Sequence, residues 1–432
     1  MNPAHPTTTS APLRLLIHGL NYAPEPVGVG KYTAEMAEWL ALRGIEVRVV
    51  TARPYYPWWR AAPAGESWDW REERGGVRVL RCPLYVPSKP GGLRRVPHLA
   101  SFAAASLPAL AAHLAWRPQV VLAVAPTLAA APAALALARA CNAVAWLHVQ
   151  DLELDMGQGM DFFSGPAGRA VLRLAMGLER AVLRRFGRVT AVSQGMVQAL
   201  ESKGVPPGRL GLTPNWADLV VFRPEAREEG REAFRRLLGL EQGRAVALYA
   251  GSMGRKQDLD LAALAARLLH HEHGPAAPLF VLCGQGPELD RLRREHGQVP
   301  NLRFLPLRPE AEHAAMLAGA DAHILPQRQG AENRSMPSKL ASILACGGPV
   351  VATASPGSEL ARAVSEAGGL VVAHADAEGL ARAVARLATD EDLRRAARRA
   401  ARRYAVTHLN KDVILDRLRG SILELVHGGR FF

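Results

Sequence analysis

A glycine-rich loop ending in lysine, residues 28–31 (GVGK), is the first stretch of the chain that could bind phosphate. The phosphate-binding loop of nucleotide hydrolases needs an earlier glycine and a later serine or threonine, and here those positions hold glutamate and tyrosine. The dinucleotide fingerprint also fails, because Thr33 stands where its third glycine belongs. Glycines still let backbone amides approach a ligand at the positive end of a helix. We therefore expect Gly28 and Gly30 to hold a diphosphate or a sugar hydroxyl; a plain tight turn is the alternative.

Two loops in the second half of the chain could complete such a site. Arg255 and Lys256 follow an apolar run at 245–253, at the place equivalent to that of the first glycine loop. Arginine forms a bidentate fork on phosphate and lysine supplies a compact charge, so we expect this pair to stabilise a diphosphate. A solvated loop is the alternative. Gly284 and Gly286 follow the next apolar run, where they would allow a nucleoside to approach closely.

A polar loop leading into a helix is the richest candidate for donor binding. Asn333, Arg334 and Ser335 could bind sugar hydroxyls and phosphate, together with the amides before Ser338 at the helix N-terminus. Lys339 lies in the first turn of that helix, where a cation opposes the helix dipole. This local cost favours a functional role for Lys339.

Polar and aromatic side chains that follow strands of the first half could face the cleft. His148 and Gln150 share one face of a buried strand, and Asp151 begins the loop beyond it. We expect His148 and Asp151 in catalytic roles and Gln150 on the acceptor side; a satisfied core histidine is the alternative. A second group follows the strand at 45–52 and could stack on an acceptor sugar, although core packing explains it equally well: Tyr55, Tyr56 and Trp58.

The sequence Asp258-Leu259-Asp260 resembles the D-x-D metal motif of some sugar transferases. It lies at the start of an expected helix, so we interpret it as favourable charge at a helix N-terminus and predict neither a metal nor a cofactor. The four cysteines are far apart and form no C-x-x-C pair. This spacing argues against a zinc site or a disulfide framework and favours a reducing cytoplasm.

Alternating strands and helices must position these residues. An apolar run at 13–20, the glycine loop, an amphipathic helix and the strand at 45–52 form a βαβ unit. The same alternation continues, breaks at a proline-containing charged segment, and starts again near residue 245. Two successive parallel α/β domains follow from this pattern. Because ligands of open parallel sheets bind beyond the carboxyl ends of the strands, the cleft between the two sheets is the expected site.

The C-terminal residues read as one amphipathic helix over 402–426 that crosses back to brace the first domain. The predicted division of the chain is an N-terminal domain at 1–215, a linker at 216–230, a C-terminal domain at 231–403, and a returning helix at 404–432.

The formal net charge of +13 favours anionic partners such as phosphorylated substrates or lipids, although arginine-rich codon usage explains it equally well. The basic residues are dispersed and no reading motif is present, so we expect no nucleic-acid partner. An uncharged stretch at 120–138 is long enough to span a bilayer. Its alanine content and two prolines instead indicate a strand, a turn and a buried helix. The N-terminal segment lacks the pattern of a signal peptide, and a cytoplasmic protein is expected.

A basic amphipathic stretch at 168–188 could lie on the anionic inner face of the plasma membrane. Its arginines on an otherwise apolar helix are Arg169, Arg173, Arg180 and Arg184. Arginine stems that cover a helix packed on the sheet are the alternative.

Seven motifs in matching order along nearly the whole chain resemble the family 4 glycosyltransferases of GT-B architecture, and most closely their colanic-acid type, which includes a fucosyltransferase group. They are LNYAPEPVGVGKYTAEMAEWL, TARPYYPWW, HVQDLELD, TPNWAD, GRKQ, LPQ and PSKLASILACGGPVVAT. The resemblance implies two Rossmann-like domains facing a central cleft. It also implies metal-independent, retaining transfer of a hexosyl group from a nucleotide-diphosphate sugar to a glycan or lipid-linked glycan in exopolysaccharide synthesis.

The resemblance also assigns roles to residues. Arg255 and Lys256 match the diphosphate clamp of the family, and Gly286 and Leu305 would lie near the base. The chain departs from the family pattern at four positions. Ser342 and Arg334 stand where two glutamates are usual, Ser252 replaces an arginine found in many members, and Gln150 replaces a histidine before the aspartate. A sugar-nucleotide epimerase or a phosphorylase of the same fold remains the alternative, and neither the sugar, the base nor the acceptor can be named.

Overall fold

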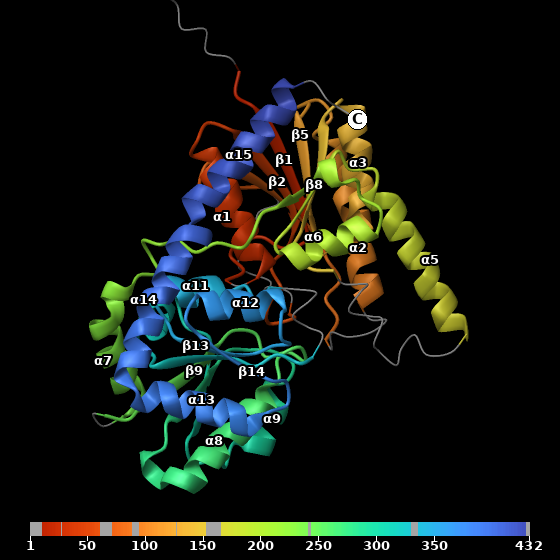
Figure 1. Ribbon diagram of the computed structural model, residues 1–432. Coiled ribbons are helices and arrows are strands. Elements are labelled where there is room, and N and C mark those ends of the chain that lie inside the picture. The colour runs from red at the N-terminus through yellow and green to blue at the C-terminus, as the bar shows by residue number, and fades with distance from the viewer. Residues whose placement is uncertain are drawn as a thin grey trace, which may run out of the picture.

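The computed structural model describes residues 11–26, 28–60, 71–88, 95–126, 128–152, 166–240, 243–329 and 336–428. They form two lobes, each built on one sheet (Figure 1). The eight strands of the N-terminal lobe are β1 Arg14–Gly19, β2 Glu46–Ala52, β3 Arg71–Arg74, β4 Val77–Cys82, β5 Val120–Ala125, β6 Val144–Val149, β7 Arg188–Ala191 and β8 Leu210–Leu212. The six strands of the C-terminal lobe are β9 Val246–Ala250, β10 Leu279–Cys283, β11 Leu302–Leu305, β12 Ala322–Leu325, β13 Val350–Thr353 and β14 Leu370–Val372.

Both sheets are parallel apart from one edge. The N-terminal order is β3-β4-β2-β1-β5-β6-β7-β8, in which only β3 runs antiparallel to its neighbour. The C-terminal order is β11-β10-β9-β12-β13-β14, with every pairing parallel. β5 and β6 are buried along their whole length, as expected of apolar strands covered on both faces. The predicted α/β architecture of two Rossmann-like domains is therefore confirmed.

Helices cover both faces of each sheet. In the N-terminal lobe, one face packs against α2 Arg95–Ala111, α3 Ala131–Ala140, α5 Pro166–Leu183 and α6 Gln194–Ser202. The other face packs against α1 Val29–Ala41 and the last helix, α15 Lys411–His427. The helices of the C-terminal lobe are α7 Arg227–Leu238, α8 Leu259–His273, α9 Leu289–His296, α10 Glu310–Gly319, α11 Lys339–Ala345, α12 Glu359–Glu366, α13 Ala377–Thr389 and α14 Glu391–His408. Short 3₁₀ turns are η2 Leu128–Ala130, η4 Pro207–Arg209, η5 Pro224–Ala226 and η6 Gly274–Ala276.

The uncharged stretch at 120–138 forms β5, η2 and the first part of α3, in agreement with the strand, turn and buried helix predicted from its prolines. Within the described ranges, no helix combines the length and the apolar character needed to cross a bilayer.

The prediction of one continuous helix over 402–426 was wrong. The chain breaks after His408, and Asn410 caps a new helix by accepting hydrogen bonds from the backbone N–H groups of Asp412 and Val413. Asparagine is a favoured N-cap because its side chain satisfies the free amides of the first turn. The break turns α15 away from α14 so that it reaches the N-terminal sheet, as Figure 1 shows in blue.

Candidate active site

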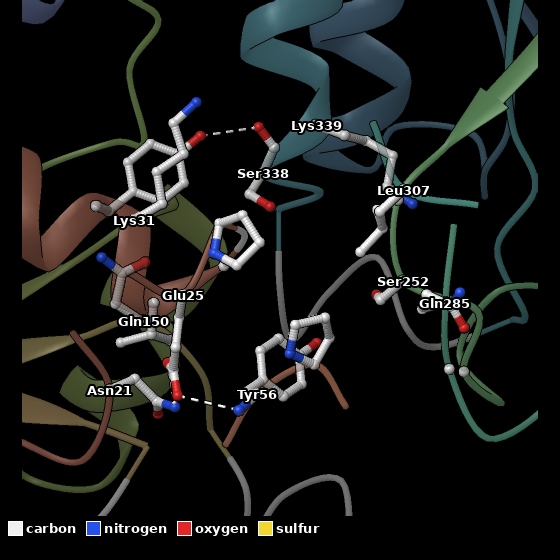
Figure 2. Close-up of a pocket in the computed structure, with 18 of the residues that line it drawn as sticks. Asn21, Glu25, Lys31, Tyr56, Gln150, Ser252, Gln285, Leu307, Ser338 and Lys339 are labelled. Atoms are coloured by element: carbon white, nitrogen blue, oxygen red, sulfur yellow. Dashed lines mark hydrogen bonds between the residues drawn. The ribbon is translucent and has the colours of Figure 1, made fainter. Parts of the chain in front are cut away.

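A cleft of about 740 Å³ separates the carboxyl ends of the two sheets (Figure 2). Its N-terminal wall comes from the loops after β1, β2 and β6, and its C-terminal wall from the loops after β9 and β10 and the start of α11. Parallel sheets place ligands at such an edge, because helix N-termini and loops converge there.

Most residues expected at the site line this cleft, as listed here: Gly28, Tyr55, Tyr56, Gln150, Asp151, Arg255, Lys256, Gly286, Ser338, Lys339 and Ser342. Five others are not among its lining residues: Gly30, Trp58, His148, Gly284 and Leu305. Asn333, Arg334 and Ser335 lie outside the described residues.

Gly30 and Gly284 do not line the cleft, but close packing explains why each position holds a glycine. A Cβ on Gly30 would lie 2.7 Å from the carboxylate of Glu25, and one on Gly284 would strike the backbone carbonyl of Gly251. These positions let the chain fold tightly around its own loops. In place of Trp58 and Leu305, residues close to them in sequence line the cleft. Trp59 lines it while Trp58 is 53% exposed, and Leu307 lines it two residues beyond Leu305.

Arg255 and Lys256, the expected diphosphate clamp, line the cleft, and each already contacts a carboxylate. Lys256 Nζ donates to Asp151 Oδ2 at 2.9 Å and so joins the two lobes. The Arg255 side chain is 90% exposed and its Nε lies 3.5 Å from a carboxylate oxygen of Glu288. An incoming diphosphate would therefore compete with Asp151 for Lys256.

Lys339 is a half-buried cation in the wall of the cleft. Its Nζ donates to the Tyr249 hydroxyl at 2.6 Å and lies 3.9 Å from the centre of that ring. Burial lowers the pKa of Lys339 to about 7, because a low-dielectric wall disfavours the ammonium form. Within the described residues it forms no ion pair with a carboxylate. An ammonium that is partly removed from water and has no carboxylate partner attracts an anion.

His148 supports the site from behind instead of facing it. Gln150 Nε2 donates to His148 Nε2 at 3.0 Å, so the ring proton lies on Nδ1 and is donated to the Thr190 hydroxyl at 3.0 Å. Burial lowers the pKa of His148 to about 4 and keeps the imidazole neutral. This neutral ring fixes the orientation of the Gln150 amide, which lines the cleft.

Glu25 is a residue of the site that sequence reasoning missed. Its Oε1 accepts the backbone N–H groups of Tyr55 and Tyr56, each at 3.1 Å, and its Oε2 accepts from Asn21 at 2.8 Å (Figure 2). Burial raises the pKa of Glu25 to about 7, although the three N–H donors favour the ionised form. Glu25 thus ties the glycine loop to the aromatic loop. Its one sequence signal was a glutamate within an otherwise apolar loop.

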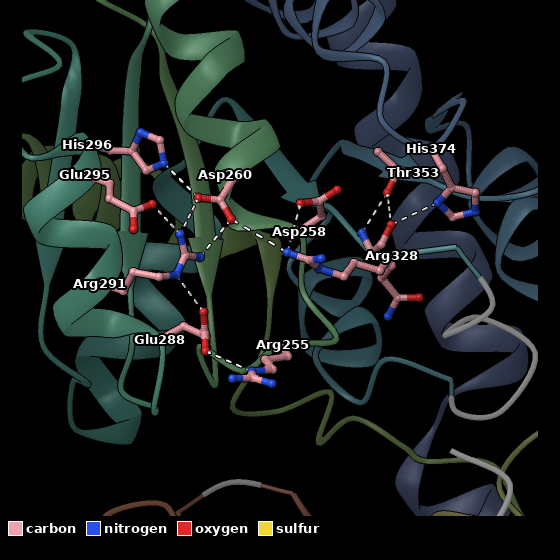
Figure 3. A network of polar contacts seen from close by, with 11 residues as sticks. Arg255, Asp258, Asp260, Glu288, Arg291, Glu295, His296, Arg328, Thr353 and His374 are labelled. Carbon is pink, nitrogen blue, oxygen red and sulfur yellow. Dashed lines mark hydrogen bonds and ion pairs between the residues drawn. The ribbon is translucent and has the colours of Figure 1, made fainter. Parts of the chain in front are cut away.

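The D-x-D sequence belongs to a polar network outside the cleft (Figure 3). Arg291 forms two hydrogen bonds with Asp260, at 2.8 and 2.9 Å, and a third with Glu295. His296 also contacts Asp260, and these hydrogen bonds, that of Arg291 foremost, lower the pKa of Asp260 to about 2. The carboxylates of a possible metal group, Asp260 and Glu295 with His296, are thus already bound to a guanidinium. We assign this network a structural role.

Comparison with known proteins agrees with this geometry. Residues 27–216 match the model of the glycosyl transferase 4-like domain, and residues 230–404 match that of the glycosyl transferases group 1. The colanic acid biosynthesis glycosyl transferase WcaI of Escherichia coli (strain K12) is 38% identical over 364 residues, which are 83% of this chain and 88% of that protein. The D-inositol 3-phosphate glycosyltransferase 1 of Catenulispora acidiphila is 30% identical over 58% of this chain and 60% of that protein.

Solved structures share the fold at low sequence identity. A sucrose-phosphate synthase from Thermosynechococcus elongatus superposes with a TM-score of 0.75 at 18% identity, over 96% of this chain and 100% of that one. The Anabaena protein HepE, solved with UDP-glucose, has a TM-score of 0.70 at 14% identity and the same coverage. With two facing parallel sheets, a cationic cleft between them and 38% identity over most of its length, the chain belongs to the GT-B glycosyltransferases of the colanic acid biosynthesis type.

Proposed function

We propose that this protein moves a hexosyl group from a nucleotide-diphosphate sugar to a glycan acceptor, with retention of anomeric configuration and without a metal. The observation that carries the proposal is the half-buried Lys339 ammonium in the wall of the interlobe cleft, which forms no ion pair among the described residues. Two further cations of the same lobe, Lys256 and Arg255, line the same cleft. Together they supply the positive charge that a departing diphosphate requires.

The reaction then needs little covalent chemistry from the protein. The bond between the sugar C1 and the diphosphate oxygen breaks, and its electron pair stays on the diphosphate. Lys339, Lys256 and the amides at the start of α11 stabilise that developing charge. The acceptor hydroxyl attacks C1 from the face that the diphosphate leaves, and its proton passes to the leaving phosphate oxygen. Gln150, Tyr55 and Tyr56 on the other lobe hold the acceptor sugar.

Two contacts between α1 and the C-terminal lobe support a site that excludes water. Tyr32 donates its hydroxyl proton to the backbone carbonyl of Ser338 at 3.0 Å, and Lys31 lies 3.4 Å from Glu310. Excluding water limits hydrolysis of the donor and strengthens electrostatic interactions in the site. We propose that the hydroxyl of Ser342, which lines the cleft, holds the ribose.

A screen of GDP-, UDP- and dTDP-sugars by thermal shift tests the donor, because a ligand that binds only the native state raises the melting temperature. Product analysis with and without a glycan acceptor then separates transfer from the action of an epimerase or phosphorylase. A glycan extended by one sugar supports the proposal. Conversion of the donor to an epimer, or to a sugar phosphate, without any extended glycan would contradict it.

The affinity for a nucleoside diphosphate should fall as pH rises above 7. Lys339 has a pKa of about 7 in the free protein, and a bound diphosphate raises it by favouring the ammonium form. Below pH 7 the lysine is already charged and affinity levels off. Above pH 7 binding must take up a proton, so the dissociation constant rises by up to about tenfold per pH unit. Calorimetry in two buffers of different ionisation enthalpy measures this uptake, which should vanish in Lys339→Met. The same slope in that variant would assign the effect to another group.

We also propose that the acceptor is lipid-linked and that the protein binds the inner face of the plasma membrane through α5. Leu174 and Leu178 are 76% and 64% exposed on this helix. Arg173, Arg180 and Arg184 beside them are exposed as well. The side chain of Arg169 lies outside the described part of the chain. An apolar pair next to a basic stripe suits an interfacial helix on anionic lipid.

Leu174→Gln/Leu178→Gln should weaken binding to phosphatidylglycerol vesicles at least about tenfold, because two leucines lose their insertion into the lipid. Vesicle flotation at low and high salt measures it, and high salt should weaken the wild type through its arginines. Leu264→Gln/Leu268→Gln on α8 is the matched control, since these leucines are also partly exposed but belong to the other lobe. If the wild type fails to float, or if both double variants lose binding equally, α5 is not the membrane contact.

A further inference from the structure

A second cavity of about 590 Å³ lies behind the cleft. Residues of β7 and β8 form its wall on the N-terminal lobe, and α11, α12 and the junction of α14 with α15 complete it. A set of residues lines both this cavity and the cleft, namely Asn215, Met336, Pro337 and Ser338. The two spaces therefore share one wall, and the volume is sufficient for a small organic ligand.

The second cavity is lined by apolar side chains together with two arginines. Its apolar side chains include Val192, Leu340, Ala363, Ile414 and Leu418. Arg188 and Arg417 also line it, and within the ranges that the structure describes neither forms an ion pair. The Arg188 Nε is buried and has no hydrogen-bond partner there.

Among the described residues that line the cavity, Glu359 carries the one carboxylate, and this group already has hydrogen-bond partners. Glu359 accepts the backbone N–H groups of Gln194 and Gly195 at 2.9 and 2.8 Å, across the two lobes. Its charge is therefore directed at the start of α6. Arg188 Nη1 donates to the Gly208 carbonyl at 3.5 Å, and the Glu424 carboxylate acts on Arg188 electrostatically without forming an ion pair within the described ranges. Guanidinium groups that form no ion pair and lie beside apolar surface favour an anion attached to an apolar body.

A buried hydrogen-bond chain connects this cavity to the cleft. Trp146 and Thr190 line the second cavity, and the Trp146 indole N–H donates to the Thr190 hydroxyl at 3.0 Å. The same hydroxyl accepts from His148, whose other ring nitrogen accepts from Gln150 in the cleft. A ligand that moves Thr190 would thus reorient the Gln150 amide.

We propose that the second cavity binds an amphipathic organic anion, in which a carboxylate, sulfonate or phosphate is carried on an apolar body, and that its occupancy changes nucleotide binding in the cleft. The anion pairs with Arg188 and Arg417, and the apolar body packs on α11 and α15. The coupling rests on the proposed function; the binding does not. Because coupling between two sites is reciprocal, a nucleotide must change the affinity for the anion by the same factor.

The fluorescent anion 8-anilinonaphthalene-1-sulfonate is the probe for binding. We expect saturable binding to the folded protein, weakened at least about tenfold in Arg188→Gln/Arg417→Gln, because a charge-assisted contact is lost. Thr407→Trp, at the exposed rim of the cavity, should block the probe without touching the arginines or the core. Arg395→Gln, an exposed arginine of α14 outside the cavity, is the control and should bind normally.

Unchanged affinity in both the double arginine variant and Thr407→Trp overturns the site. An equal loss in Arg395→Gln does so as well, since it would show a non-specific charge effect. Melting temperatures of all variants identify any that fail to fold. If the double arginine variant fails to fold, probe binding by Thr407→Trp decides whether the site exists.

The coupling is tested by titrating the same probe with and without UDP, GDP and dTDP. We expect a finite change in probe affinity that saturates with nucleotide, and its loss in Thr190→Val with probe binding retained. A probe affinity that falls without limit as nucleotide rises indicates competition for one site and overturns the proposal. No change with any nucleotide overturns the coupling alone. Failure of the proposed function is distinct, because it appears as missing glycan product.

Discussion

Lys339→Met should lower kcat/KM for sugar transfer by about a hundredfold to a thousandfold. The methionine keeps the length and the packing of the buried stem but removes the charge, and one preorganised charged donor in a water-excluded site is worth about that much. Among the described residues, the polar contacts of the Lys339 ammonium are the hydroxyl and the ring of Tyr249. The loss should fall mainly on kcat, because negative charge on the diphosphate grows as the glycosidic bond breaks.

The loss of activity in Lys256→Ala is the reference with which the loss in Lys339→Met is compared. Lys256 is 39% exposed and already paired with Asp151, so its removal should lower turnover by only about tenfold, or ~1.4 kcal/mol of transition-state stabilisation. Steady-state kinetics with the donor found by thermal shift ranks the two variants. A larger loss at Lys256 than at Lys339 would place the diphosphate near the loop after β9, and unchanged kinetics in both would remove the diphosphate from this wall altogether.

Glu25→Ala should destabilise the protein by about 3–5 kcal/mol and abolish transfer. The substitution leaves the buried N–H groups of Tyr55 and Tyr56, and the amide of Asn21, without their acceptor, and each such loss costs about 1–3 kcal/mol. Urea denaturation measures the free energy of unfolding. Glu25→Ala should weaken binding of the acceptor more than binding of the donor, because the aromatic loop lies on the N-terminal side of the cleft.

Two matched variants separate this role from a general effect of charge removal. Glu25→Gln keeps the shape and one carbonyl oxygen, so it should cost less than Glu25→Ala, about 1–2 kcal/mol. Glu38→Ala removes a partly exposed glutamate that pairs with Arg74 at 2.9 Å, and a pair of this kind contributes at most about 1 kcal/mol. If Glu25→Ala is no more costly than Glu38→Ala, Glu25 does not tie the two loops together.

Local sequence patterns were sufficient to predict most strands and helices of the fold. The uninterrupted apolar run of β5 and the glycine loop followed by an amphipathic helix are properties of neighbouring residues, so they identify a covered strand and a βαβ unit. β3 was missed because its sequence, REER, carries no apolar alternation, and its antiparallel pairing occurs at the sheet edge. Edge strands with exposed charges leave little periodic signal.

The site was harder to predict wherever it depends on contacts distant in sequence. Residue types and loop positions were enough to indicate Lys256 and Lys339. The pairing of Lys256 with Asp151 and that of Lys339 with Tyr249 join residues 105 and 90 positions apart, so no local pattern could show which lysine is left without a carboxylate. Glu25 was missed for the same reason, since its partners lie 30 and 31 residues away.

The return of α15 to the first lobe has a consequence for how the chain matures on the ribosome. Ile414, Leu415, Leu418 and Ile422 fill one face of a sheet whose first strand begins at Arg14. α1 covers part of that face early, but the part under α15 stays exposed while the second lobe is synthesised and is covered only when α15 leaves the exit tunnel. A nascent chain of this topology exposes hydrophobic surface for most of its translation. Holding chaperones bind chains of this kind.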